Sequence, residues 1–368
     1  PDGSLNIDYS NLDETIDRLK EMGMEPMMLI GWEMPPSLAN QECAADDSSY
    51  PPGTECPPED YSEWEELIYQ IVKHYNIDRG DDITYWEVWN EPNSDEYGGD
   101  TELGIQNIQN YLMLYEATVN GALAADPSIK IGGPNIASSC GNGPIFGESC
   151  FWVQDGEESV GKEWTESLLE FSSENNIQLD FLAFHKYSFV HPKHYLTLVN
   201  DMKSLAQSYG LNPELIMGEW ALWQTLDEKS AAYAASSMQY QLKSDLDMSC
   251  FISINGLNHE DEPINYFPHS FNLAVIDGKV VHTPYFVFRM FNMLGENKLH
   301  TSINDGLDIS EDDSIGVISA MDEGSIQIFA WRYDDLDQLE KSLSFTVENL
   351  NSKFQNANNF HVNAYLID

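Results

Sequence analysis

The sequence predicts an α/β fold built as a (β/α)8 TIM-type barrel, and two observations predict it. Strand-like runs alternate with helical patterns from residue 12 to residue 294, which is typical of parallel strands joined by helices. Two of these runs end in a glutamate, Glu91 and Glu219. Because a barrel presents its functional side chains at the carboxyl ends of its strands, both glutamates are candidate site residues.

The helices are predicted from apolar side chains at helical spacing. Residues 12–22 carry Leu12, Ile16, Leu19 and Met22 on one face, and Gly23 follows as a stop signal. The same reasoning predicts helices over residues 64–75, 105–125, 164–175, 195–209, 231–246 and 285–294.

The strands of the barrel are predicted over residues 26–31, 83–90, 129–132, 179–184, 214–218 and 250–255. A closed barrel of this type needs eight strands, two more than these. We therefore expect that the sequence begins at the third strand and lacks the first two βα units. An upstream segment or a second chain would then complete the barrel. The alternative is an architecture that is not a closed barrel.

The pattern changes after Gly295, where short alternating strands and tight turns predict antiparallel hairpins. The expected strands cover residues 315–320, 326–331, 342–347 and 361–367. We expect a barrel catalytic domain over residues 1–296 and a small β-sandwich accessory domain over residues 297–368.

The charge of the chain restricts the class of ligand. Its 62 acidic residues against 17 Lys and Arg give a net charge of −45, spread over all 368 residues. Such a surface repels phosphate backbones and anionic membranes, so we expect no nucleic-acid partner. No apolar run reaches the roughly 18 residues that span a bilayer, so we expect no membrane insertion. The acidic surface suits high salt, or alternatively an acidic or calcium-rich medium. We expect a secreted protein, extracellular or at the cell surface, in a saline environment.

The five cysteines fall into two close pairs and a single residue. Cys43 with Cys56, and Cys140 with Cys150, lie in polar loops rich in Pro and Gly, without zinc-finger spacing. Both pairs are expected to form disulfides. Cys250 opens an apolar run and is expected to be a buried thiol of a core strand.

Two carboxylates at the ends of barrel strands are the minimum equipment for hydrolysis of a glycosidic bond. Carboxyl groups about 5–5.5 Å apart favour double displacement with retention, whereas about 6.5–9.5 Å favours inversion. The sequence leaves this distance open. A lone glutamate at a strand end is more often solvated or paired with a neighbour.

Short motifs around both glutamates resemble a known group of enzymes. Trp89–Pro92 resembles the Asn-Glu-Pro signature of clan A glycoside hydrolases, and Gly218–Trp220 resembles their nucleophile strand. Family 39, which contains β-xylosidases and α-L-iduronidases, is the most similar. Further segments that resemble this family are Gly31–Ala39, Gly132–Pro134, Phe184–Tyr187 and Pro284–Phe286.

The resemblance implies a role for each matching residue. Glu91 would be the general acid/base and Glu219 the nucleophile, Asn90 would donate to the sugar 2-hydroxyl, and Tyr187 would bond the nucleophile. We expect His185 to line the same site and Trp32, Trp220 and Trp223 to contact substrate, although tryptophans also simply fill cores. No metal or organic cofactor is implied.

We therefore expect a retaining glycoside hydrolase that cleaves a polysaccharide or oligosaccharide by double displacement, with β-xylosides as the first guess. The rival interpretation is a non-catalytic carbohydrate-binding or structural extracellular assembly protein that reuses a hydrolase barrel. A third is hydrolysis of a glycan with uronic acids, which the negative charge disfavours unless Lys186 or Lys193 forms a local positive pocket.

Overall fold

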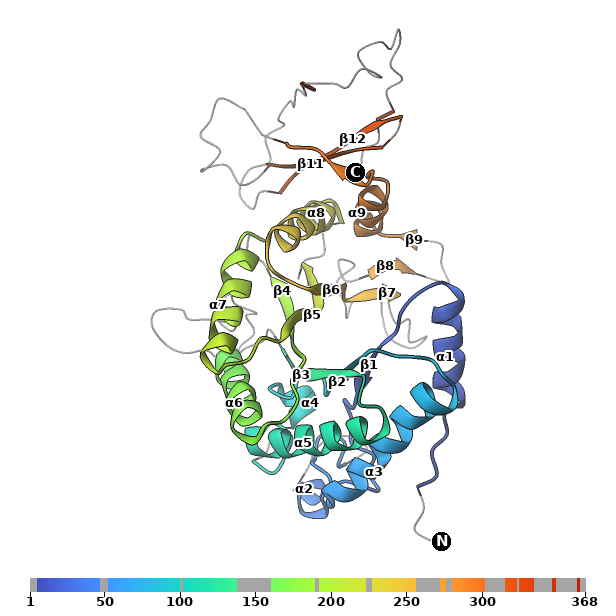
Figure 1. The fold of residues 1–368 in the computed structure, drawn as a ribbon, viewed down its shortest axis with the longest axis vertical. Coiled ribbons are helices and arrows are strands. Elements are labelled where there is room, and N and C mark those ends of the chain that lie inside the picture. The colour runs from blue at the N-terminus through green and yellow to red at the C-terminus, as the bar shows by residue number, and fades with distance from the viewer. Residues whose placement is uncertain are drawn as a thin grey trace. The chain divides into compact units, whose positions relative to one another are not determined.

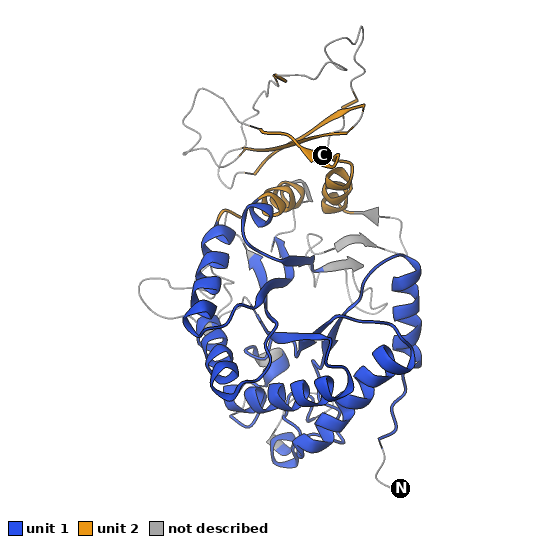
Figure 2. Cartoon of the chain, in the orientation of Figure 1, with its two compact units in different colours: residues 1–190, 194–223, 240–252 blue, residues 191–193, 224–239, 253–368 orange. Residues whose placement is uncertain are grey.

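The computed structural model describes residues 5–46, 52–99, 102–137, 160–188, 192–222, 227–255, 272–275, 280–301, 315–322, 324–333, 346–348 and 363–364. The chain forms two compact units (Figure 2). The first comprises residues 1–190, 194–223 and 240–252, and the second residues 191–193, 224–239 and 253–368. The boundary predicted between residues 296 and 297 stays a prediction. None of the described helices combines the length and the apolar character needed to cross a membrane.

The first unit is organised around one six-stranded parallel sheet in chain order (Figure 1). Its strands are β1 (Met27–Ile30), β2 (Tyr85–Val88), β3 (Lys130–Ile136), β4 (Phe181–Ser188), β5 (Glu214–Leu222) and β6 (Met248–Phe251). The sheet curves, and the helices between the strands lie on its outer face. This is a partial (β/α) barrel, as the alternation of strand and helix patterns predicts.

The seven predicted helices fall close to their expected positions, and the structure adds the short helices α2 (Gln41–Asp46) and α4 (Asp95–Gly98), which were not predicted. The predicted helices are α1 (Ser10–Glu21), α3 (Tyr61–Val72), α5 (Ile108–Ala125), α6 (Val160–Asn175), α7 (His194–Ser208), α8 (Asp227–Lys243) and α9 (Thr283–Asn292). Helix α3 continues as a π-helix, Lys73–Asp78. Asp60 and Asn107 cap α3 and α5 by accepting backbone N–H groups of the first turn, which satisfies donors that a helix start leaves unpaired.

Apolar side chains from the amino-terminal parts of the strands pack together against the six-stranded sheet. Phe181, Ala183 and Ile216 are at most 1% exposed and form one cluster with Met27, Tyr85 and Met248 around them. In a parallel sheet, residues paired across neighbouring strands lie at the same distance along the barrel axis, so their side chains form one layer of the interior. The polar side chains of the site therefore lie above this layer, toward the carboxyl ends of the strands.

The second unit contains two small sheets. Strands β7 (Ser253–Asn255), β8 (Asn272–Val275) and β9 (Val280–Val281) form one, and β10 (Asn297–Lys298), β11 (Ile315–Met321) and β12 (Ile326–Arg332) form the other. The hairpin β11–β12 is antiparallel, as its turn signals predict. The strand predicted over 342–347 lies outside the described residues except for 346–347, which are not in a strand, and that over 361–367 lies outside them except for 363–364, also not in a strand.

Candidate active site

The turn after β2 holds Glu91 in a constrained backbone conformation. Trp89 and Glu91 both have positive φ angles, 66° and 43°, which non-glycine residues rarely adopt. Two backbone hydrogen bonds fix the turn to its neighbours: Trp89 N–H donates to Ile30 O at 2.9 Å, and Glu91 N–H donates to Asn135 O at 3.0 Å. The turn is thus anchored to strand β1 on one side and strand β3 on the other.

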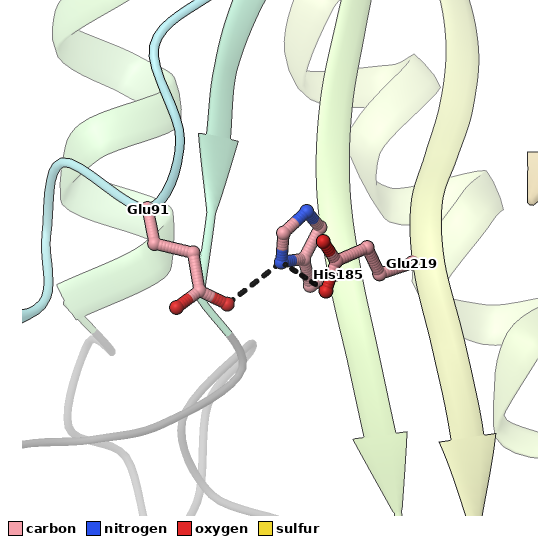
Figure 3. A group of neighbouring side chains, drawn as sticks. All are labelled: Glu91, His185 and Glu219. Atoms are coloured by element: carbon pink, nitrogen blue, oxygen red, sulfur yellow. Dashed lines mark hydrogen bonds and ion pairs between the residues drawn. The ribbon is translucent and has the colours of Figure 1, made fainter. Parts of the chain in front are cut away.

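His185 lies between the two candidate carboxylates (Figure 3). Its Nδ1 is 2.7 Å from Glu91 Oε1 and 3.4 Å from Glu219 Oε2, and the histidine side chain is fully buried. One donor or acceptor atom from each of the three side chains lies within 4.8 Å of the other two. The fold therefore brings together Glu91 and Glu219, which are far apart in the sequence, and adds the ring that links them.

Glu219 has a second partner on strand β4. The hydroxyl of Tyr187 donates a hydrogen bond to Glu219 Oε2. Burial raises the pKa of Glu219, while the charge of His185 and the hydrogen bond from Tyr187 act in the opposite direction. His185 and Tyr187 are thus the two groups that favour the ionised form of Glu219.

The protonation of His185 depends on the same contacts. Burial alone would lower the pKa of His185, but its hydrogen bond with Glu91 and the charges of Glu219 and Glu91 raise the pKa above its ordinary value. A charged imidazolium between two carboxylates offsets part of their mutual repulsion. The ring can therefore hold both carboxyl groups close together.

Glu87 is a further carboxyl group that the sequence analysis does not single out. It lies on strand β2, pairs in register with Leu29 and Gly132, and is 6% exposed. Its Oε1 has no hydrogen-bond partner among the described residues. Burial raises the pKa of Glu87 to about 8, an effect that the charge of His185 opposes. A polar residue in an otherwise apolar run of a buried strand is the signal that finds it.

The three tryptophans expected to contact substrate lie in different environments, as far as the structure describes them. Trp32 is 52% exposed, and its ring stacks on that of Tyr97 with 6.1 Å between centroids. A cavity of about 510 Å³ adjoins Trp32 and is lined also by Leu29 and Met34. An exposed ring beside a cavity is free to stack on a sugar. Trp223 lies outside the described residues.

The substrate contact expected for Trp220 stays a prediction. Trp220 follows Glu219 directly in strand β5, whose pairing with β6 shifts register between Met217 and Trp220. It is 1% exposed and packs edge-on against Phe251 with 5.0 Å between ring centroids. The Trp220 ring is therefore part of the packing between strands β5 and β6.

The loop after β1 contains the disulfide expected between Cys43 and Cys56, with 5.9 Å between the Cα atoms. The second expected pair, Cys140 and Cys150, lies outside the described residues. Cys250 is a free thiol that is partly buried on strand β6.

Glu91, His185 and Glu219 are also the one group in the described part of the chain whose donor atoms are close enough for a metal ion. These atoms already pair with one another through the hydrogen bond and ion pairs given above. The expectation of a metal-free and cofactor-free site stays a prediction.

A partial (β/α) barrel with two glutamates facing each other at its strand ends defines the class of glycoside-hydrolase-like barrels. The family model for glycosyl hydrolases family 39 matches residues 1–212. The chain belongs to this family.

Similar proteins support this assignment. A β-xylosidase of Geobacillus stearothermophilus is 29% identical over 192 residues, which are 51% of this chain and 32% of that protein. An α-L-iduronidase of Mus musculus is 24% identical over 189 residues, 50% of this chain and 25% of that protein. The chain thus aligns with about a third or less of the length of these relatives.

Solved structures share the fold. The chain resembles a monomeric β-xylosidase from Caulobacter crescentus with a TM-score of 0.67 and 20% identity, covering 92% of this chain and 65% of that one. A family 39 enzyme from Xanthomonas axonopodis pv. citri gives a TM-score of 0.68 at 21% identity, with 92% and 63% covered.

Proposed function

We propose that the protein is a retaining glycoside hydrolase that uses Glu91 as acid/base and Glu219 as nucleophile. The observation that carries this proposal is the placement of both carboxylates near the Nδ1 atom of one buried histidine, with one oxygen of each carboxylate within 4.8 Å of one oxygen of the other. This proximity supports a retaining mechanism, because an inverting mechanism needs a wider gap between its carboxyl groups to hold a water.

The proposed chemistry has two steps. In the first, Glu219 attacks the anomeric carbon while Glu91 gives its proton to the leaving oxygen, so that a glycosyl–enzyme ester forms and an alcohol leaves. In the second, Glu91 takes a proton from a water that displaces Glu219, which releases the sugar with its original configuration. Asn90, which is 5% exposed beside Glu91, is proposed to hold the sugar 2-hydroxyl.

The proposed substrate is a β-xyloside, because named β-xylosidases are among the similar proteins at 29% and 26% identity. The preserved carboxylate pair does not favour a purely structural or carbohydrate-binding role. Exposed Trp32 beside its cavity is proposed to contact the sugar chain.

A panel of chromogenic aryl glycosides tests this function. Glu219→Ala and Glu91→Gln should each lower kcat/KM on the preferred glycoside by at least about a thousandfold. Glu170→Gln is the matched control, because Glu170 is an exposed glutamate of helix α6. Unchanged activity in either of the first two variants would defeat the assignment.

We also propose that a further strand-bearing segment packs on the outer edge of β1 and completes the barrel. Among the described strands, β1 pairs only with β2, and Leu29, at the height of Glu87, is 40% exposed. An apolar strand with a free edge favours pairing with another segment. Fast hydrogen exchange of the outward amides of β1 is expected in this chain, and slow exchange would contradict the proposal.

The proposed location is extracellular or at the cell surface, in a saline medium. The Cys43–Cys56 disulfide suits an oxidising compartment, and the net charge of −45 suits high salt. Unfolding measured against NaCl concentration should show rising stability, whereas no gain would count against the saline setting.

A further inference from the structure

Asn135, on strand β3, contacts the candidate acid/base turn through its main chain. It is 2% exposed and has a φ of 53°, a left-handed conformation that asparagine tolerates better than most residues. In this conformation its carbonyl oxygen accepts the N–H of Glu91 at 3.0 Å. The backbone of Asn135 therefore helps to set the position from which Glu91 reaches the reaction centre.

The side chain of Asn135 extends the contact to Asn90. Asn135 Nδ2 donates to Asn90 Oδ1 at 3.4 Å, and both residues are buried. Because Asn90 Oδ1 accepts this hydrogen bond, the NH2 group of Asn90 points in a fixed direction. Asn90 is the residue proposed above to hold the substrate hydroxyl.

The side-chain oxygen of Asn135 and a ring nitrogen of His185 both lie beside Gly218. Asn135 Oδ1 and His185 Nε2 are both buried and have no hydrogen-bond partner among the described residues. Both lie against Gly218: a β-carbon built there would be 2.8 Å from Asn135 Oδ1 and 3.5 Å from His185 Nε2. An amide oxygen is the acceptor that the second N–H of an imidazolium requires, and the glycine leaves the space for the two to approach.

We propose that Asn135 is a positioning residue that fixes Asn90 and His185 relative to the two reacting carboxylates. Its amide group stands between a residue that holds substrate and the ring that holds Glu91 and Glu219 together. Among the described residues, the side chain of Asn135 makes its hydrogen bond to Asn90 and none to either carboxylate. Its effect on catalysis therefore passes through Asn90 and His185, and this part of the inference rests on the proposed hydrolase function.

The test compares two asparagines with the same backbone conformation. Asn135→Gly keeps the left-handed backbone and the carbonyl but removes the amide. Asn176→Gly is the matched control, because Asn176 has a φ of 55° and is exposed at the end of helix α6. On an aryl glycoside that the wild-type protein hydrolyses, Asn135→Gly should lower kcat by about 10- to 100-fold, the effect of losing one hydrogen bond to a charged group. Asn176→Gly should leave kcat within about twofold.

A double-mutant cycle of Asn135→Gly and Asn90→Ala distinguishes a positioning role of Asn135 from a general loss of structure. If Asn135 acts through Asn90, adding Asn135→Gly to Asn90→Ala should cost much less than it costs alone. Fully multiplicative losses, or an Asn135→Gly variant as active as the control, would overturn the proposal. Asn135→Asp, which keeps the size of the side chain but lacks the NH2 donor, is expected to lower kcat as well and serves if the glycine variant does not fold.

A spectroscopic readout is independent of turnover. The ¹⁵N resonance of His185 Nε2 should shift in Asn135→Gly and stay unchanged in Asn176→Gly. An unchanged Nε2 resonance in Asn135→Gly would refute the proposed interaction of Asn135 with His185. A wild-type protein that hydrolyses no glycoside, yet whose Asn135→Gly variant shows this shift, would instead refute the proposed function and leave that interaction standing.

Discussion

Replacing Glu87 by glutamine should stabilise the folded protein at neutral and alkaline pH. In the folded state burial raises the pKa of Glu87 to about 8, against an ordinary value of 4.5. Between these two pH values the unfolded chain ionises Glu87, whereas the folded chain keeps it protonated. The carboxyl group therefore favours the unfolded state increasingly from pH 4.5 to pH 8, and its contribution is constant below and above that window.

The magnitude follows from the width of the window. Each pH unit corresponds to about 1.36 kcal/mol, so the carboxyl group costs the folded state about 5 kcal/mol by pH 8 relative to pH 4.5. Glutamine has nearly the same shape and titrates in neither state. The free energy of unfolding of Glu87→Gln should thus rise relative to wild type by an amount that grows with pH.

Urea unfolding at pH 5, 6, 7 and 8 measures this difference, with the slope of the transition as a check that both proteins unfold in the same way. The exposed Glu170→Gln variant is the control and should track wild type within about 0.5 kcal/mol at every pH. If Glu87→Gln and wild type show the same dependence on pH, Glu87 does not hold its proton in the folded state and the reasoning is refuted.

Three further outcomes are expected. Tyr187→Phe removes the hydroxyl that bonds Glu219, which raises the pKa of Glu219; the acidic limb of the kcat–pH profile should move to higher pH, and an unmoved limb would contradict the role of Tyr187. Gly121→Ala should lower the melting temperature despite alanine's better helix propensity, because its β-carbon would stand 2.3 Å from Glu65 O across the α3–α5 contact; a higher melting temperature would contradict this packing. Cys43→Ser with Cys56→Ser should lower the free energy of unfolding by about 3 kcal/mol, as expected for opening a loop of this size; equal stability of the two proteins in urea would show that the disulfide constrains nothing.

Much of the fold was predictable because the strands of the first unit are short apolar runs separated by helices with regular spacing. The same logic predicted Glu91 and Glu219, since a carboxylate directly after a buried strand has few other places to lie than the open end of a sheet. What the pattern alone does not give is the distance between them, which depends on the curvature of the sheet and on His185.

Glu87 and Asn135 were not predicted as site residues, and each omission has a physical reason. Glu87 lies inside a strand, where a single polar residue is easily read as facing solvent, although a strand covered by helices on one side can place it only toward the barrel interior. Asn135 follows Gly132–Pro134 and sits at a register shift between β3 and β4, which periodicity does not reveal.

The central claim is that Glu219 forms the covalent bond to the sugar and that Glu91 supplies and removes the proton. The most direct measurement is to incubate the wild-type protein with an activated 2-deoxy-2-fluoro glycoside of the preferred sugar, and to locate the attached sugar by peptide mass spectrometry. We expect one sugar on Glu219, still attached in Glu170→Gln and absent from Glu219→Ala. A sugar on another residue, or no covalent intermediate during turnover of the unmodified glycoside, would contradict the assignment of Glu219 as the nucleophile.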